Sequence, residues 1–350
     1  MDVVTIAVTG AAGLVGRQLL PVLADEPGVT RVIGLDVREP TRRVSGLEFH
    51  LADVLHSELK PLLEDVDVLV HLASVVDPIP DEQLMARVNI EGTRRVLDAA
   101  AAVGVGRIVR VSTTAVYGAW PDNPVPLTEE VPLRPNAAFT PAVQAAEVER
   151  LLAEWRDEHP STTVTVLRTA PVLGPGADRL PSRLLLGRPR LRIRGSSPPV
   201  QATHVDDLVR AVLLVALDDH PGTYNVASDG WLDADAAAAL LRPPMLPPLN
   251  AELLERVLMH GWSTGLIDIH PGVVPYLAHP WVVSTDLLQS KGWYPRHTTE
   301  QAILDGLASL PETDTDKRVL AYALGVATGA VLVAAARRRR HRAARGGRRG

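Results

Sequence analysis

Cysteine is absent from the 350 residues, and lysine and tyrosine are scarce, with three and five residues respectively. Without cysteine the chain can form no disulfide, no thiolate metal site and no cysteine nucleophile, which suits a reducing compartment. The first residues, MDVVTIAVTG, carry an acid at position 2 and no basic stretch, so we expect no signal peptide. These absences exclude disulfide-stabilised and thiol-dependent classes of protein.

The composition is that of a globular protein with a hydrophobic core. Hydrophobic residues make up 46% of the chain and charged residues 22%, which excludes a disordered or collagen-like chain. A length of 350 residues allows two modest domains.

The net charge of −5 conceals a strong asymmetry between the body of the chain and its C-terminal end. Residues 337–350, RRRRHRAARGGRRG, contain eight arginines and no acid. Without these eight, the chain has 28 basic against 41 acidic residues, a net charge of −13. Such a tail favours contact with anionic lipid or with nucleic acid, and we regard nucleic acid as the weaker alternative.

Apolar segments of strand length alternate with helical patterns along the first half of the chain. Helices are expected over residues 14–24 and 82–103 and again from residue 141. This alternation predicts βαβ units and a parallel sheet, and the continuous apolar strands indicate helices on both faces. The expected strands are VVTIAVTG, RVIGLD, LEFHLADV, VDVLVHLAS, RIVRVST and TVTVLRTAPVLG.

A glycine motif, TGAAGLVG, joins the first expected strand to the first helix. Gly10 allows a tight turn, Gly13 lets the backbone approach a pyrophosphate, and Gly16 lets the helix pack close to the strand. Twenty residues after Gly16 the second strand ends in Asp36, which can accept hydrogen bonds from an adenosine ribose and repel a 2′-phosphate. This predicts NAD in preference to NADP, although Arg38 nearby could soften that preference. The alternative is a glycine turn without a nucleotide site, in which Asp36 at the strand end serves only as a cap.

Further motifs follow in order along the chain, and with the glycine motif they resemble the extended short-chain dehydrogenase/reductases, also called NAD-dependent epimerase/dehydratases. The resemblance covers about residues 3–308 and implies a doubly wound parallel sheet that binds NAD. The motifs are LADV with Asp53, HLAS at 71–74, NIEGT with Asn89, STTAVYG at 112–118, LRTAPVLGPG at 167–176, HVDD at 204–207, YNVA at 224–227 and KGWYP at 291–295.

The resemblance implies roles for several side chains. Asp53 should meet the adenine, Ala73 should border the nicotinamide, and Thr113 should hydrogen-bond the reacting hydroxyl. Thr113 could equally bond only backbone groups. Tyr117 could line the substrate cleft or be a packed aromatic at the end of the strand.

Two further motif residues are expected to be structural. Asn89 should bond neighbouring main chain. His204 should lie at a helix start that Asp206 or Asp207 caps, with no metal bound.

The catalytic dyad of the family is missing from this chain. In the family, the helix after the VYG strand carries a tyrosine and, four residues later, a lysine that lowers the tyrosine's pKa. Aligned through AEVERLL, these positions hold Pro141 and Ala145, while Thr140 is expected to cap the helix. No shift of register restores the dyad, and Arg150 cannot replace a lysine because it stays protonated. The tyrosines stand at 117, 224, 276, 294 and 322, and the lysines at 60, 291 and 317.

Residues 319–336, VLAYALGVATGAVLVAAA, form an uncharged run of eighteen residues. As a helix it would extend about 27 Å, just short of a hydrocarbon core of about 30 Å. Gly325 and Gly329 form a G-x-x-x-G pattern that suits packing in membranes. A terminal helix buried on the protein is the alternative. By the positive-inside rule the arginine tail should lie on the cytoplasmic side, where the nucleotide-binding domain is also expected. A single span would place the two on opposite sides of the membrane.

The predicted fold is an α/β, Rossmann-type doubly wound parallel sheet with a smaller C-terminal substrate-type domain and a C-terminal hydrophobic helix. The expected division is residues 1–170 with 204–228 for the NAD(P)-binding domain, 171–203 with 229–312 for the second domain, and 313–350 for the linker, helix and tail. We expect a cytoplasmic domain held at a membrane by 319–350, a small-molecule ligand in the interdomain cleft, and leave a homodimer open.

Two functions remain open. The first is a catalytically impaired NAD(H)-binding sensor or scaffold. The second is an active oxidoreductase or epimerase, acting on a sugar nucleotide or hydroxy substrate, that uses Thr113, Tyr117 or water in place of the dyad.

Overall fold

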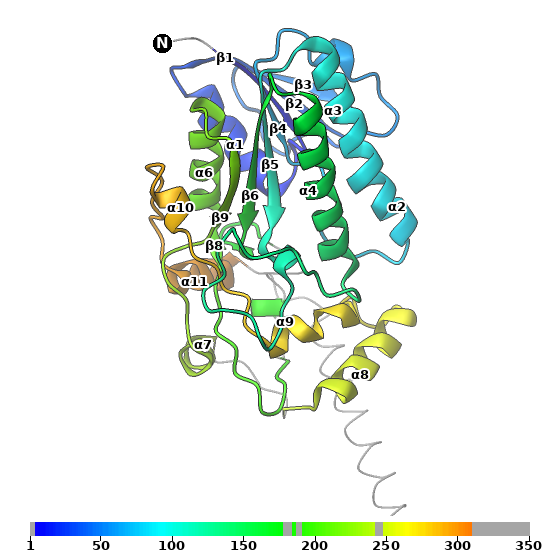
Figure 1. The fold of residues 1–350 in the computed structure, drawn as a ribbon, viewed down its shortest axis with the longest axis vertical. Coiled ribbons are helices and arrows are strands. Elements are labelled where there is room, and N and C mark those ends of the chain that lie inside the picture. The colour runs from blue at the N-terminus through cyan, green and yellow to red at the C-terminus, as the bar shows by residue number, and fades with distance from the viewer. Residues whose placement is uncertain (1–3, 178–183, 187–190, 242–247, 310–350) are drawn as a thin grey trace, which may run out of the picture.

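The computed structural model describes residues 4–177, 184–186, 191–241 and 248–309; the other residues are drawn in grey (Figure 1). The expected hydrophobic helix at 319–336 and the arginine tail at 337–350 lie outside the described residues. Among the residues described, no helix is long and apolar enough to cross a membrane.

A seven-stranded parallel sheet forms the larger lobe, in the order β3-β2-β1-β4-β5-β6-β9. Most strands contain a run of buried apolar residues, as the sequence predicts for a sheet covered on both faces, whereas no residue of the edge strand Leu47–Leu51 is buried. The strands are β1 (Val4–Thr9), β2 (Val29–Asp36), β3 (Leu47–Leu51), β4 (Val68–His71), β5 (Arg107–Thr113), β6 (Thr163–Thr169) and β9 (Gly222–Val226). This confirms the Rossmann-type parallel sheet.

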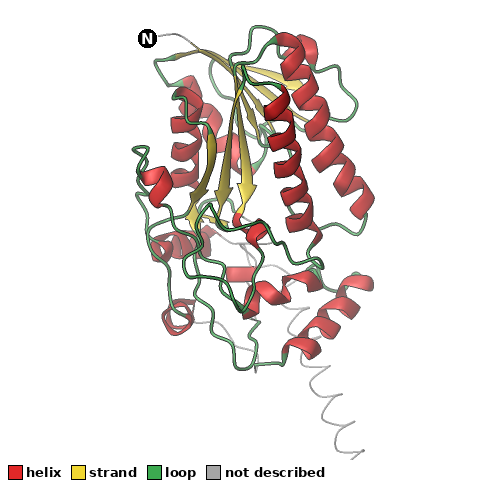
Figure 2. Cartoon of the chain, in the orientation of Figure 1, coloured by secondary structure: helices red, strands yellow, loops and turns green. Residues whose placement is uncertain are grey.

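Helices cover both faces of the sheet (Figures 1 and 2). On one face α1 (Leu14–Ala24) and α6 (Val205–Leu217) bury their leucines and valines against β1, β4 and β5. On the other face α3 (Gly92–Val103) and α4 (Thr140–Glu158) pack against the same strands. The helix expected over 82–103 is divided into α2 (Glu82–Ala86), a π-helical turn η2 (Arg87–Glu91) and α3.

The start of α4 differs from the prediction by one residue. The helix begins at Thr140, and its N-cap is Phe139, which makes no side-chain cap. Thr140 instead donates its hydroxyl to Glu82 Oε1 at 3.0 Å. The prediction that Thr140 caps the helix was therefore wrong, because that hydroxyl has a partner in another element.

A second lobe lies beyond the carboxyl ends of the strands (Figure 1). One of its cores gathers Ile193, Leu254, Leu258, Ile267, Val273 and Val274. A short parallel pair, β7 (Val172–Leu173) and β8 (Thr203–His204), precedes α6. The helices and turns are η1 (Lys60–Leu62) and η3 (Thr114–Tyr117) in the first lobe, and α7 (Ala234–Leu241), α8 (Ala251–Ser263), η4 (Pro271–Val273), α9 (Val274–Ala278), α10 (Asp286–Gln289) and α11 (Thr299–Ser309) after β9.

Candidate functional site

Two of the three motif glycines, Gly10 and Gly16, lie where the backbone leaves no room for a side chain. Gly10 has a φ of +71°, and a Cβ there would stand 2.7 Å from the Ala73 nitrogen. A Cβ on Gly16 would stand 2.5 Å from the Gly10 oxygen. Gly13 is the N-cap of α1, which has no side-chain cap and no acid in its first turn. The first N–H groups of α1 therefore stay available to an anion in the cavity.

Asp36 at the end of β2 is fixed by the glycine loop. Its Oδ2 accepts a hydrogen bond from Ala12 N–H at 2.9 Å, and its Oδ1 accepts one from Arg38 N–H at 3.0 Å. Both Asp36 and Arg38 line the cavity described below. A carboxylate oxygen can accept more than one hydrogen bond, so Asp36 retains capacity for a ribose hydroxyl.

Asp53 lies at the same end of the cavity, after β3. Its Oδ1 accepts a hydrogen bond from Leu55 N–H at 2.8 Å, and its Oδ2 lies 3.0 Å from His56 Nδ1. The hydrogen bond from His56, with that from Leu55, lowers the pKa of the Asp53 carboxyl. The group is therefore an anion that accepts hydrogen bonds.

Ala73 is held by a buried chain of hydrogen bonds through His71. Ala73 N–H donates to Thr9 Oγ1 at 3.3 Å, and Thr9 Oγ1 lies 2.7 Å from His71 Nδ1. His71 Nε2 lies 3.0 Å from Thr93 Oγ1, which donates its own proton to Asn89 O. His71 therefore donates from Nε2, and burial keeps its pKa well below the usual value. A neutral His71 thus positions the backbone beside Gly10.

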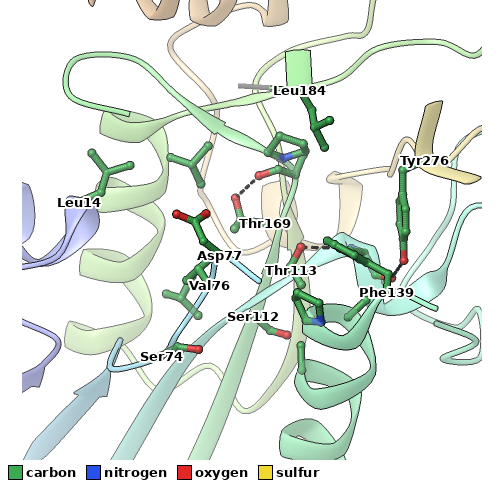
Figure 3. A pocket seen from close by; sticks show the side chains of 18 of the residues that line it. Leu14, Ser74, Val76, Asp77, Ser112, Thr113, Phe139, Thr169, Leu184 and Tyr276 are labelled. Atoms are coloured by element: carbon green, nitrogen blue, oxygen red, sulfur yellow. Dashed lines mark hydrogen bonds between the residues drawn. The ribbon is translucent and has the colours of Figure 1, made fainter. Parts of the chain in front are cut away.

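One cavity of about 990 Å³ joins the glycine cradle to the second lobe. Its volume lies at the upper end of the roughly 300–1,000 Å³ usual for ligand sites, so two ligands can share it. Figure 3 shows part of its lining. Every cofactor-site residue expected from the sequence contributes to it: Gly10, Gly13, Gly16, Asp36, Arg38, Asp53 and Ala73.

Thr113 ends β5 and lines the middle of the cavity. Its Oγ1 accepts a hydrogen bond from Ala115 N–H at 3.2 Å (Figure 3). The backbone contact that the sequence left open is present, yet it uses only the acceptor side of the hydroxyl. The O–H group can still donate to a ligand oxygen.

Pro141 and Ala145 both line this cavity from the first turns of α4. Neither side chain can hold or release a proton. Ala142 and Val148 are the other members of this helix that face the cavity, and they are equally inert. The wall of the cavity that α4 supplies is therefore apolar.

A buried ion network, whose charged residues had no role assigned from the sequence, lies beside the cavity. Arg168 on β6 donates from Nε and Nη2 to Glu149 Oε2 on α4, at 2.9 and 2.7 Å. Glu149 Oε1 accepts a 2.5 Å hydrogen bond from Ser112, a cavity residue next to Thr113. Arg110 on β5 donates to the carbonyl oxygens of His71 and Ala73 at 3.1 and 3.2 Å. The available signal was an arginine inside each of two apolar strands, since a buried charge requires partners.

Tyr117 belongs to this network and not to the cavity. It is 1% exposed and is absent from the described lining. Its hydroxyl donates to Asn225 Oδ1 and accepts from Arg168 Nη1, each at 2.8 Å. Burial raises the pKa of the phenol. This geometry favours the packed-aromatic interpretation and gives no support to proton exchange with a substrate.

The two motif residues expected to be structural are engaged within the protein. Asn89 Oδ1 accepts from Val75 N–H at 2.8 Å, and its Nδ2 donates to Gln144 Oε1 at 2.9 Å. His204 is itself the N-cap of α6, because its Nδ1 accepts from Asp206 N–H at 3.2 Å. The cap was predicted to be Asp206 or Asp207, so that detail was wrong. Asp206 and Asp207 occupy the first turn of α6 instead.

Curated relatives match most of the chain. An uncharacterised protein of Mycobacterium tuberculosis is 28% identical over 312 residues, which cover 86% of this chain and 82% of the relative. The dTDP-glucose 4,6-dehydratase of Streptomyces griseus is 30% identical over 255 residues, covering 67% of this chain and 76% of that protein.

Solved structures share the fold. The UDP-glucose 4-epimerase of Thermus thermophilus, solved with NAD, aligns with a TM-score of 0.68 at 22% identity, covering 87% of this chain and 98% of that one. The UDP-glucuronic acid 4-epimerase of Bacillus cereus, also solved with NAD, aligns with a TM-score of 0.67 at 19% identity, covering 90% and 99%. The model of the NAD dependent epimerase/dehydratase family matches residues 6–227, and the chain therefore belongs to that family.

Proposed function

We propose that this protein binds NAD(H) at the glycine cradle and transfers little or no hydride to the alcohols and sugar nucleotides that its family oxidises. The cradle of Gly10, Gly13 and Gly16, together with the Asp36 carboxylate, fits a dinucleotide with an unphosphorylated ribose. Solved neighbours with the same fold hold NAD.

The observation that carries the impaired activity is the inert surface of α4. Pro141 and Ala145 line the cavity where the family's tyrosine and lysine would exchange and tune a proton. Loss of a positioned general acid or base costs about 10² to 10⁴ in rate. When bound, the cofactor would supply a hydride acceptor. The side chains of this helix could orient a ligand and exclude water, but they could not move its proton.

Binding without turnover would suit a role as a sensor or scaffold.

Residues 319–350 would hold the NAD-binding body at a membrane. This second part of the proposal is supported by the uncharged run at 319–336 and the eight arginines after it. Membrane sedimentation tests this. The intact chain should pellet with membranes and be released by detergent, whereas a chain ending at Asp316 should stay in the supernatant. Release of the intact chain by salt alone would show that residues 319–336 are not inserted and that the arginines bind the membrane surface through their charge.

Native mass spectrometry and calorimetry of the purified protein test the binding proposal. We expect NAD to be retained or bound in preference to NADP, with neither NADH nor an epimerised sugar nucleotide formed when UDP-glucose is added. Failure to bind either dinucleotide would refute the proposed function.

One observation favours the alternative of an active enzyme. The Thr113 hydroxyl faces the cavity with its donor side available, and the Ser112–Glu149 pair lies beside it. Turnover by the unmodified chain that Thr113→Ala abolishes would favour this second function.

A further inference from the structure

The part of the cavity that the second lobe builds has an apolar wall. Aromatic and aliphatic side chains dominate it: Leu191, Ile193, Val200, Leu277, Trp281 and Val282. This inference rests on the proposed function, in which NAD(H) occupies the glycine cradle and leaves this part for a second ligand. An apolar wall stabilises an apolar ligand by about 25 cal/mol per Å² removed from water.

Several polar groups of this wall are already paired within the protein. The Tyr276 hydroxyl donates to Ala115 O at 2.9 Å, and Trp281 Nε1 donates to Tyr276 O at 3.1 Å. Both ends of the Gln201 amide bond to Val283, at 3.0 and 2.8 Å. The hydrogen-bonding groups of these three side chains are therefore already used within the protein.

Charge is equally sparse there. Within the described part of the chain, Arg192 is the one charged residue that the second lobe contributes to the lining, and it already has a partner. A nucleoside diphosphate sugar carries a charged diphosphate, and buried anions require paired cations or several N–H donors. The described side chains of this wall supply one cation for such an anion, Arg192.

One hydroxyl between the cradle and the apolar wall can still donate a hydrogen bond. Thr113 accepts from Ala115 N–H and lines the cavity, so its O–H can still donate to a ligand oxygen. We propose that the second ligand is an uncharged, mainly apolar molecule with a single hydroxyl or carbonyl oxygen, and not a nucleoside diphosphate sugar. The carbonyl or hydroxyl oxygen would accept from Thr113, and the apolar body would fill the second-lobe part of the cavity.

Fluorescence titration of the full chain with Prodan, an uncharged naphthalene ketone, tests this, in the presence and absence of NAD. We expect saturable binding with blue-shifted emission, and no displacement by UDP-glucose. A matched pair of substitutions on α7 locates the site. Ala238 lines the cavity, whereas Ala236 is exposed and absent from the lining.

Ala238→Glu should weaken Prodan binding by about tenfold or more, because the ligand would strip water from a carboxylate. Ala236→Glu adds the same charge to the same helix and should leave binding unchanged. Equal binding by both variants, no saturable binding, or displacement by UDP-glucose would overturn the inference. Loss of NAD binding alone would refute the proposed function, while Prodan binding sensitive to Ala238→Glu would still support the apolar site.

Discussion

Gly16 lies against the carbonyl of Gly10, with room for a hydrogen atom but not for a methyl group. A Cβ on Gly16 would stand 2.5 Å from the Gly10 oxygen. Gly16→Ala should therefore shift α1, lower the free energy of unfolding by about 1–3 kcal/mol and weaken NAD binding at least about tenfold. Gly28→Ala is the matched control, because nothing lies within 4 Å of its added Cβ. Calorimetry and denaturant unfolding measure both; equal effects in the two variants would contradict the close packing.

Asp36 should set the preference between the two dinucleotides. Asp36→Ala removes an acceptor for the ribose and a repulsive charge, so NAD should bind more weakly by about 1.5–3 kcal/mol while NADP loses less. Asp98→Ala, on the exposed side of α3, removes the same charge elsewhere and should change neither affinity. Calorimetry with both dinucleotides checks this. Unchanged NAD affinity in Asp36→Ala would refute the role of the carboxylate.

His71 should make stability fall in mild acid. Burial holds its folded pKa well below 6.5, so the unfolded chain takes up a proton that the folded chain refuses. The contribution of the neutral imidazole is therefore fully present above about pH 6.5 and declines as the pH falls towards the folded pKa, by up to about 1.4 kcal/mol per pH unit. His204 and His270 act in the same direction, because burial lowers their pKa values too.

His71→Gln should flatten that pH dependence by about one proton, in addition to any loss of stability at neutral pH. The comparison uses unfolding free energies of the natural chain and of the variant, measured between about pH 7 and about pH 5. Histidine side chains titrate within about this range. An identical slope in the variant would show that His71 takes up its proton in the folded state.

The buried pair of Arg168 and Glu149 should be far more sensitive than an exposed pair. Arg168→Met leaves Glu149 charged and buried, which should cost about 3–5 kcal/mol of unfolding free energy. Arg156→Met makes the same change in an exposed pair, in which the Arg156 side chain is 49% exposed and the Asp157 side chain 72%. This change should cost about 0–1 kcal/mol of unfolding free energy. Denaturant unfolding gives both values. Similar costs would mean that water reaches Glu149.

The sheet and the cofactor end of the site could be predicted because both rest on local patterns. Strand-length apolar runs, the glycine spacing and Asp36 at a strand end all express short-range geometry, and the helix expected at 14–24 has these bounds in the structure. The π-helical turn at 87–91 could not be predicted, because apolar periodicity alone does not distinguish a slightly wider turn.

The middle of the site was harder, since it depends on pairings between distant residues. Tyr117 turns away from the cavity because Arg168 and Asn225, far along the chain, satisfy its hydroxyl. Thr140 fails to cap α4 because Glu82 accepts its proton. None of these three partners can be read from the neighbouring sequence, so composition and spacing leave such roles open.

Restoring the dyad tests whether its loss alone limits chemistry. Pro141→Tyr with Ala145→Lys would place a tyrosine and a lysine one turn apart on the cavity side of α4, the lysine lowering the tyrosine's pKa. Pro141→Tyr with Ala145→Met is the matched control, similar in length and without the charge.

The most direct measurement is single-turnover hydride transfer, followed by nicotinamide absorbance, with NAD-saturated protein and an uncharged, mainly apolar secondary alcohol. The natural chain should bind NAD and form NADH at least about 10²-fold more slowly than the Tyr–Lys variant, with the Tyr–Met control remaining slow. Rapid NADH formation by the natural chain, at a rate that the Tyr–Lys pair does not raise, would contradict the account.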